Sequence, residues 1–304
     1  MGSTMRRFSI AACLMALAPA VGLGAETIPA PASKAASKSS EAAEAAGGEE
    51  SGFRTTVIGQ KEIRETDPVG SYGQPVWTAK RRFPTTRVYV IPDGAVTIEY
   101  WLTTSGAMDG DSQPSYESQF EFELGLGKRL QFDLYFVFGQ DGYAAPLALT
   151  KEKIELRYAL ADWGSLWGNP AIYLEWIRRH EKPQKGEVKL LLGDEITPVW
   201  FWGFNIVFER EFGGESANEY ALSAGLSRVV VQNRVNIGVE VKVVAEDVSG
   251  ARFDFVEKRF LAGPSLQVKP VRGVFVNLVP MAGVVMADET EGIYTVYLII
   301  GKDL

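Results

Sequence analysis

The stretch from residue 118 to residue 138 constrains the fold more strongly than any other part of the sequence. Apolar and polar side chains alternate along it, and the tight turn Gly127-Lys128-Arg129 divides it in two. The apolar series is Phe120, Phe122, Leu124, Leu126, Leu130, Phe132, Leu134, Phe136 and Phe138. This alternation predicts a β-hairpin with one apolar and one ionic face. In a soluble sheet the apolar face would pack on a core, whereas in a transmembrane barrel it would face lipid and the ionic face a wet lumen.

The first 25 residues have the pattern of a secretory signal. Arg6 and Arg7 precede an apolar run from Phe8 to Leu23, and small residues follow where a signal peptidase would cut. The sequence therefore predicts a signal peptide over 1–25 and export. Cys13 is the only cysteine, so the mature protein would form no disulfide. No later apolar run reaches the ~18 residues of a spanning helix, so a membrane crossing would be made by strands.

Two segments of different composition separate this signal from the alternating part of the chain. Residues 26–52 consist largely of Ala, Ser, Lys, Glu, Pro and Gly, which predicts a disordered linker because little apolar surface can be buried. Residues 53–94 are rich in Pro and Gly, which predicts a periplasmic arm of short extended pieces. Its cationic cluster is Lys80, Arg81, Arg82 and Arg87. The cluster is either a solvated basic turn or a set of partners for carboxylates at the mouth or in the lumen of a barrel.

Twelve strand-like runs follow residue 95, most of about the length that a tilted strand needs to cross a bilayer. They lie near 96–104, 116–126, 130–138, 151–160, 171–178, 187–193, 200–212, 219–227, 234–245, 253–269, 273–283 and 293–302. Short connections, such as 127–129, alternate with longer polar ones, such as 140–150. A meander with short turns at one end and long loops at the other is typical of an outer-membrane barrel whose short turns are periplasmic.

The tryptophans and the last run support this interpretation. At the end with the short turns lie Trp163, Trp167, Trp200 and Trp202, where they would form an aromatic girdle at a membrane interface. The last run resembles the C-terminal recognition strand of bacterial outer-membrane proteins, although Leu304 stands where an aromatic residue is usual.

On this pattern the chain resembles the porin-like outer-membrane β-barrel superfamily of bacteria over roughly 95–304. The resemblance implies an all-β, antiparallel up-and-down transmembrane β-barrel of about twelve strands, following a disordered N-terminal linker. It also implies a place in the bacterial outer membrane, contact with its lipid, and assembly by the barrel-insertion machinery. The oligomeric state does not follow from it.

The ionic face of the strands supplies the candidate site. These residues are expected to face the lumen, since a Lys or Arg at the midplane of the lipid side would cost on the order of 2–4 kcal/mol. They are Glu121, Glu123, Asp133, Glu155, Arg157, Glu175, Lys189, Glu209, Glu240 and Lys242. They line either a narrow pore that selects solutes or ions, or a lumen filled by mutually neutralised pairs. Their excess of carboxylates favours cations, unless the cationic arm enters the lumen.

Other classes of function have little support. An outer-membrane phospholipase needs a serine within reach of a histidine, and the sole histidine, His180, has none placed to serve it on the next run. The sequence therefore predicts no catalytic residue and no enzyme. One histidine and no mature cysteine disfavour a zinc site, and neither a metal nor a cofactor is implied. The net charge of -7 argues against nucleic acid as a partner.

The sequence thus predicts an outer-membrane barrel that forms a narrow pore for passive or weakly selective passage of small solutes or ions. A non-conducting structural or adhesive barrel is one alternative. A soluble periplasmic β protein that binds an apolar ligand is another.

Overall fold

The computed structural model describes residues 63–304 apart from 111, 215 and 249–251. This part of the chain contains twelve strands and one 3₁₀ helix, η2 (Val76–Thr78). The strands are β1 (Val96–Ala107), β2 (Ser115–Gly127), β3 (Leu130–Asp141), β4 (Ala148–Ala159), β5 (Ala171–Arg179), β6 (Gln184–Thr197), β7 (Trp200–Phe212), β8 (Asn218–Val231), β9 (Val235–Asp247), β10 (Glu257–Val268), β11 (Val274–Met286) and β12 (Thr290–Asp303). Within the described residues no helix is long and apolar enough to cross a membrane. The predicted signal peptide and linker lie outside these residues.

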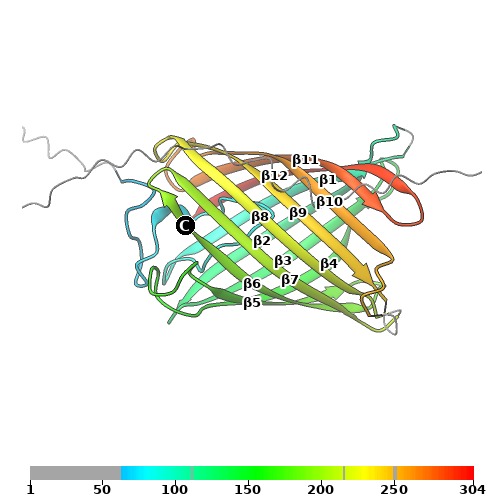
Figure 1. Cartoon of the computed structure of the whole chain (residues 1–304), viewed down its shortest axis with the longest axis horizontal. Coiled ribbons are helices and arrows are strands. Elements are labelled where there is room, and N and C mark those ends of the chain that lie inside the picture. Colours follow the sequence, from blue (N-terminus) through cyan, green and yellow to red (C-terminus); the bar gives the residue numbers. More distant parts are fainter. Residues whose placement is uncertain (1–62, 111, 215, 249–251) are drawn as a thin grey trace, which may run out of the picture. The chain divides into compact units, whose positions relative to one another are not determined.

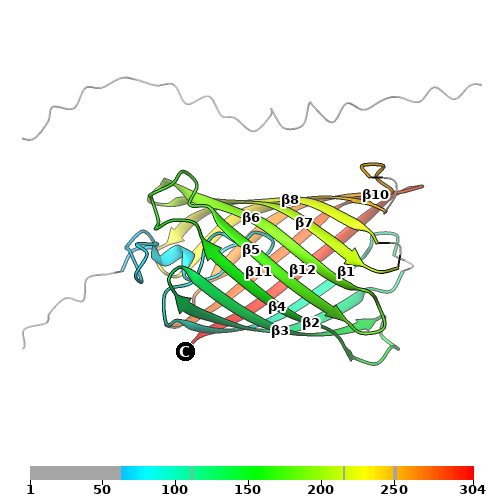
Figure 2. The same cartoon turned by 90° about the horizontal axis from the view of Figure 1, so that it is seen from below.

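The strands form one closed antiparallel barrel (Figures 1 and 2). Each strand pairs with its neighbours in sequence, and β12 closes the barrel on β1. Ile98 of β1, for example, lies opposite Phe122 of β2 on one side and Lys302 of β12 on the other. The predicted up-and-down barrel of about twelve strands is confirmed.

Four strands begin three or more residues away from the predicted start. β4, β6 and β12 start three residues earlier, at Ala148, Gln184 and Thr290, and β10 starts at Glu257 instead of 253. The delay in β10 has a local cause: Phe253 and Phe255 pack their rings against Tyr220 of β8. Phe253 also has a φ of 65°, which a β-strand does not accommodate.

The two ends of the barrel differ in their connections. Short turns and the C-terminus lie at one end, called the short-turn end here, and longer loops at the other, the long-loop end (Figure 1). The β2–β3 turn is tight because Gly127, Lys128 and Arg129 all take positive φ values of 82°, 52° and 63°. The halves of the lumen next to these ends are called the short-turn half and the long-loop half.

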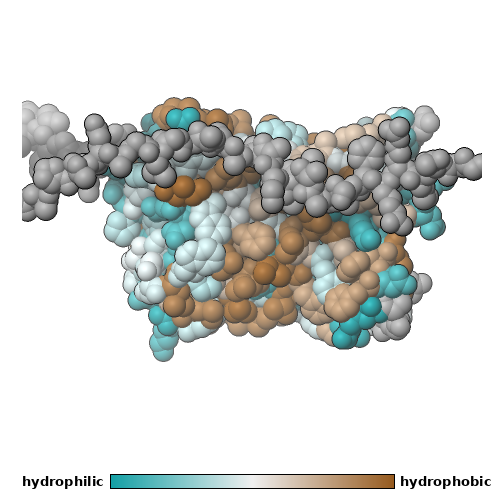
Figure 3. All heavy atoms as spheres, viewed as in Figure 1, coloured by the Kyte–Doolittle hydropathy of each residue, from teal (hydrophilic) through white to brown (hydrophobic). Residues whose placement is uncertain are grey.

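Side chains alternate between the two faces of the wall. Phe120 is 43% exposed on the outer face, whereas the neighbouring Glu121 is fully buried on the inner face. Other exposed apolar residues of the outer wall include Ile154, Leu174, Ile206, Leu222, Val239 and Leu278. Figure 3 shows hydrophobic side chains gathered over the middle of the wall and hydrophilic ones mostly toward its ends. An apolar outer band with an ionic interior is the arrangement of a transmembrane barrel.

Residues 63–94, called the arm below, fold into the short-turn half of the lumen (Figures 1 and 2). A bridge between Pro68 and Pro75 and the helix η2 shape its first part. Most of the remaining arm is extended and winds along the inner wall. Six buried apolar residues of the arm form one cluster with inward-facing residues of the wall such as Tyr173, Leu191 and Phe201. They are Tyr72, Trp77, Phe83, Val88, Tyr89 and Val90.

Candidate functional site

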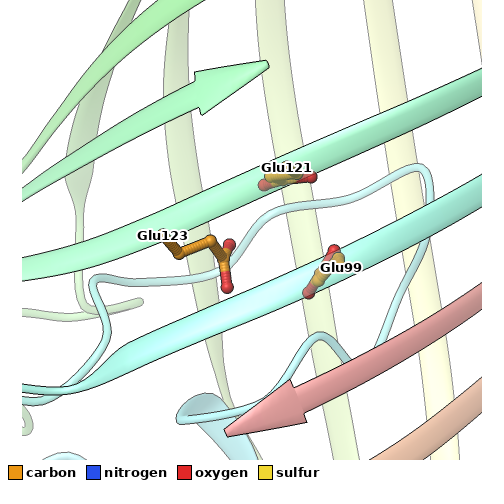
Figure 4. A group of neighbouring side chains, drawn as sticks. All are labelled: Glu99, Glu121 and Glu123. Atoms are coloured by element: carbon orange, nitrogen blue, oxygen red, sulfur yellow. The ribbon is translucent and has the colours of Figure 1, made fainter. Parts of the chain in front are cut away.

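The arginine Arg81 lies at the centre of the contact between the arm and the inner wall. Its Nε donates to Glu99 Oε2 at 2.5 Å, and its Nη2 donates to Glu121 Oε1 at 2.7 Å and Glu123 Oε1 at 3.3 Å. The three carboxylates project from β1 and β2 toward the backbone of the arm (Figure 4). Glu99 and Glu121 are fully buried and Arg81 is 2% exposed at its side chain. One guanidinium therefore neutralises part of a cluster of three carboxylates shielded from water.

A second arginine of the arm, Arg87, extends this network around the wall. Its guanidinium bonds to Glu121, to Glu123 Oε1 at 3.0 Å and to the Tyr135 hydroxyl at 3.1 Å. Burial alone would lower the pKa of Arg87, but the charges of Glu121, Tyr135 and Glu123 raise it well above its ordinary value, so the group stays a cation. On the wall, Arg157 pairs with Glu155 Oε1 at 2.5 Å and Asp133 Oδ2 at 3.3 Å.

A third ionic cluster ties the start of the arm to the short-turn end. Glu65 accepts from Arg82 Nη2 at 2.8 Å and from Lys269 Nζ at 2.6 Å. Burial would raise the pKa of Glu65, but the charges of Arg82 and Lys269 lower it. Burial lowers the pKa of Lys269 to about 8, against the attraction of Glu65. Lys269 follows β10 in a short turn, so the start of the arm is held by a residue of the barrel rim.

Amide side chains of the wall, and the carboxylate of Glu240, bind the backbone of the arm. Asn205 accepts from the Arg87 N–H at 2.8 Å and donates to the Arg87 carbonyl at 2.6 Å. The Arg81 carbonyl accepts from Gln267 Nε2 at 2.6 Å and from Asn277 Nδ2 at 2.8 Å. Glu240 accepts from both the backbone N–H and the hydroxyl of Thr85, at 2.8 and 2.6 Å. An extended segment inside a barrel has no ladder of its own, and these side chains satisfy its buried polar groups.

Glycines of the wall make room for the apolar residues of the arm. A Cβ on Gly225 would lie 2.5 Å from the Phe83 ring, and a Cβ on Gly193 would lie 2.3 Å from the Val88 side chain. Both distances are too short for packed carbon atoms. The inner wall is therefore shaped to fit this particular arm.

The packing around the arm leaves little free space. A void of about 30 Å³ remains beside Arg81 and Arg87, bordered on the wall by Glu123 and Arg157. A void of this size holds about two water molecules.

Charged residues of the long-loop half are paired with one another and remain partly wet. Lys185 Nζ lies 2.5 Å from Glu209 Oε1, Lys189 Nζ 2.7 Å from Glu187 Oε1, and Arg259 Nη2 2.9 Å from Glu219 Oε2. Their side chains keep 13–35% exposure, against 0–4% for the carboxylates that hold Arg81. Water therefore reaches the inner wall in this half of the lumen.

The predicted lumen residues fall into two groups in the structure. On the side of the arm lie Glu121, Glu123, Asp133, Glu155, Arg157 and Glu240, all buried. Glu175 of β5 lies opposite Glu155 and is also buried, whereas Lys189, Glu209 and Lys242 are partly exposed on inward positions of β6, β7 and β9. Their role in selectivity stays a prediction.

The four residues of the predicted cationic cluster all have carboxylate partners. Lys80 pairs with Asp303, Arg81 with Glu99, Arg82 with Glu65, and Arg87 with Glu121.

The four tryptophans lie at the short-turn end but have different surroundings. Trp167 is 79% exposed and its ring lies 5.8 Å from that of Trp202. Trp163 instead packs edge-on against Trp77 and Tyr89 of the arm, at 5.6 and 5.2 Å. Its backbone N–H donates to the Tyr72 carbonyl, so the long 160–170 turn closes over the arm.

Several residues in the contact between the arm and the wall were not among the predicted site residues. They are Glu65, Glu99, Gln131, Asn205, Gln267, Lys269 and Asn277. Glu99 lies at an inward-facing position of the first strand-like run, so the alternation in the sequence could have identified it. The amides carry no charge, so a search for ionic residues passes over them.

The groups that could bind a metal or act in catalysis already have charged neighbours in the structure. Among the described residues, two sets of carboxylates could hold a cation by geometry, Glu99–Glu121–Glu123 and Glu121–Asp133–Glu155. The guanidinium groups of Arg81, Arg87 and Arg157 already lie among them. His180 lies at the long-loop end with its Nε2 3.6 Å from Glu152 Oε2.

The described residues form a closed twelve-stranded antiparallel β-barrel with an apolar outer face, an ionic inner face and a segment of its own chain packed inside. No protein-family model and no curated protein matches the sequence.

Solved structures with a similar fold include outer-membrane channels and porins. The COG4313 outer membrane channel from Pseudomonas putida F1 is 12% identical with a TM-score of 0.47, covering 71% of this chain and 98% of that one. The NanC porin is 8% identical with a TM-score of 0.48, covering 66% and 98%. The KdgM porin is 10% identical with a TM-score of 0.40, covering 67% and 97%.

Proposed function

We propose that this protein is a gated outer-membrane channel for small solutes or ions, in which the arm is the gate. With the arm docked, the short-turn half of the lumen is closed. Passage takes place when the arm withdraws from the wall and leaves the ionic inner face open to water. The apolar outer band and the signal-like first 25 residues support a place in the outer membrane.

The observation that carries this proposal is the difference between what fills the two halves of one lumen. Eight strands enclose a space that inward side chains can fill, whereas twelve enclose more. Here the excess space in one half is filled by residues 63–94, which belong to no strand of the barrel. The charged pairs of the other half keep contact with water. Non-covalent contacts hold the arm on the inner wall, so it can leave without any change in strand pairing.

A non-conducting barrel is the second candidate. The small void of about 30 Å³ beside Arg81 supports it, since the arm packs closely on the wall there. In that case the arm would be a permanent part of the core, and the loops at the long-loop end would carry the function. The two candidates differ in whether the arm ever leaves.

A reversible crosslink between arm and wall distinguishes them. The hydroxyls of Thr86 and Ser223 lie 3.2 Å apart, so Thr86→Cys with Ser223→Cys is placed to form a disulfide. The only natural cysteine is Cys13, in the predicted signal peptide, so no other thiol competes in the mature chain. Conductance is measured in planar bilayers before and after reduction, with each single cysteine variant as control.

We expect the unlinked protein and both single variants to show discrete openings, and the oxidised double variant to stay closed until it is reduced. If the oxidised variant conducts like the unlinked protein, the arm is not the gate. If the unlinked protein never conducts although it migrates as a folded barrel on gels, the non-conducting barrel is the correct reading.

A further inference from the structure

A groove of about 610 Å³ lies on the outer face of the barrel wall and crosses β8, β9, β10 and β11. Its base is formed by Pro264 and Pro280, and larger apolar side chains such as Leu226, Leu266 and Leu278 border it. The groove faces away from the lumen and from the arm. Its position on the apolar band makes lipid the medium that it meets.

The groove owes its depth to the two prolines. Pairing between β10 and β11 joins Ala262 to Ala282 and Leu266 to Leu278, and no partners are paired between these positions. The register places Pro264 opposite Pro280 in this gap. Neither proline has an N–H to donate to a ladder, and both have compact side chains. The result is a hollow among long aliphatic residues, at a place where β10 and β11 lack part of their pairing.

One end of the groove carries an arginine without an acidic partner. Arg228 lies opposite Trp200 on β7 and Ile237 on β9, and its guanidinium carbon is 5.7 Å from the centre of the Trp200 ring. Within the described residues the structure gives this guanidinium no carboxylate. Arg129, another outward arginine near an aromatic ring at the short-turn end, pairs with Asp162 Oδ1 at 2.9 Å.

The groove begins at the rim and runs toward the middle of the wall. Trp200 is the first residue of β7, whereas Pro280 lies near the centre of β11 (Val274–Met286). Crossing from β7 to β11 takes four strand spacings, or about 19 Å at ~4.8 Å each. That length is close to the ~15 Å of hydrocarbon in one leaflet. A single acyl chain therefore fits the groove along its length.

We propose that this groove is a specific site for one phospholipid of the leaflet at the short-turn end. The acyl chain lies over Pro264 and Pro280, and the phosphate pairs with Arg228 beside the Trp200 indole. A guanidinium matches phosphate oxygens in geometry and charge, and an indole prefers the headgroup level. Charge complementarity commits the site to a phosphate-bearing lipid, because an arginine at the rim of an apolar groove would otherwise lack a counter-charge.

Retention of lipid by the purified full chain tests this proposal. The protein is held in non-ionic detergent and titrated with dioleoyl phosphatidylglycerol, and bound lipid is counted by native mass spectrometry. We expect one tightly retained lipid per chain. Arg228→Gln should weaken its binding by about tenfold, the loss that one charge-assisted contact produces. Arg129→Gln is the matched control and should leave binding unchanged, since its guanidinium is already paired.

Two further measurements separate the contribution of the groove from that of the charge. Pro280→Phe fills the base of the groove from the lipid side and should also weaken binding, while dioleoylglycerol, which has the same chains and no phosphate, should bind at least tenfold more weakly than the phospholipid. Equal binding by Arg228→Gln and Arg129→Gln, equal binding of the two lipids, or no retained lipid at all would each overturn the proposal. The site needs an apolar outer wall but not a moving arm, so a chain that binds lipid and never conducts refutes the gate alone.

Discussion

The two halves of the lumen use the same kinds of side chain under opposite conditions. In the short-turn half, Arg81 and Arg87 meet carboxylates that are 0–4% exposed. In the long-loop half, pairs such as Lys185 with Glu209 keep 23% and 13% exposure. A buried pair that loses one partner costs about 3–5 kcal/mol, whereas an exposed pair contributes about 0–1 kcal/mol. The charges of the short-turn half therefore hold the arm in place. Those of the long-loop half only change the electrostatic potential in the lumen.

The largest expected effect comes from removing the central cation of the arm. Arg81→Gln leaves Glu99, Glu121 and Glu123 buried with Arg87 as their remaining cationic partner from the arm. A loss of about 3–5 kcal/mol would shift docking of the arm by more than 100-fold. We expect a large rise in open probability in planar bilayers, with strand pairing intact by circular dichroism.

The control for this change is Arg129→Gln, which removes an exposed pair with Asp162 outside the lumen. It should leave open probability within a factor of a few. A similar result for both variants would mean that the buried network does not hold the arm. A change in ion preference without a change in open probability would instead identify these carboxylates as part of an open pore wall.

The barrel could be predicted from the sequence, because period-2 alternation and the spacing of turns directly determine which face each residue takes. Glu121 and Glu123 could be placed on the inner face for the same reason. Their partners could not be identified, since a Pro/Gly-rich segment such as 63–94 has no period that fixes its path. Gly193 and Gly225 show the same limit: a strand glycine is ambiguous until the Val88 or Phe83 side chain that fills its space is known.

A smaller effect is expected from pH, through the cluster at the start of the arm. The pKa of Lys269 is about 8 with the arm docked, below its ordinary value of about 10.4. Between these values the released state binds more protons than the docked state, so docking becomes more stable as pH rises from 8 toward 10. Open probability should fall between pH 8 and pH 9, by at most about tenfold. Lys269→Met should remove this dependence, and an unchanged slope in that variant would assign it to another group.

The smallest expected effect is a shift in ion preference from changes in the long-loop half, and its direction depends on which charge is removed. Lys185→Gln removes the positive member of a partly wet pair and should shift the reversal potential toward cation preference, while Glu209→Gln should shift it toward anions. Each change in permeability ratio should be about twofold or less at 0.1 M salt, because screening acts over ~10 Å. Neither variant should alter open probability, since neither residue touches the arm. If either one opened the channel as Arg81→Gln does, the division between a holding half and a wet half would be wrong, and the arm would be coupled to the whole inner wall.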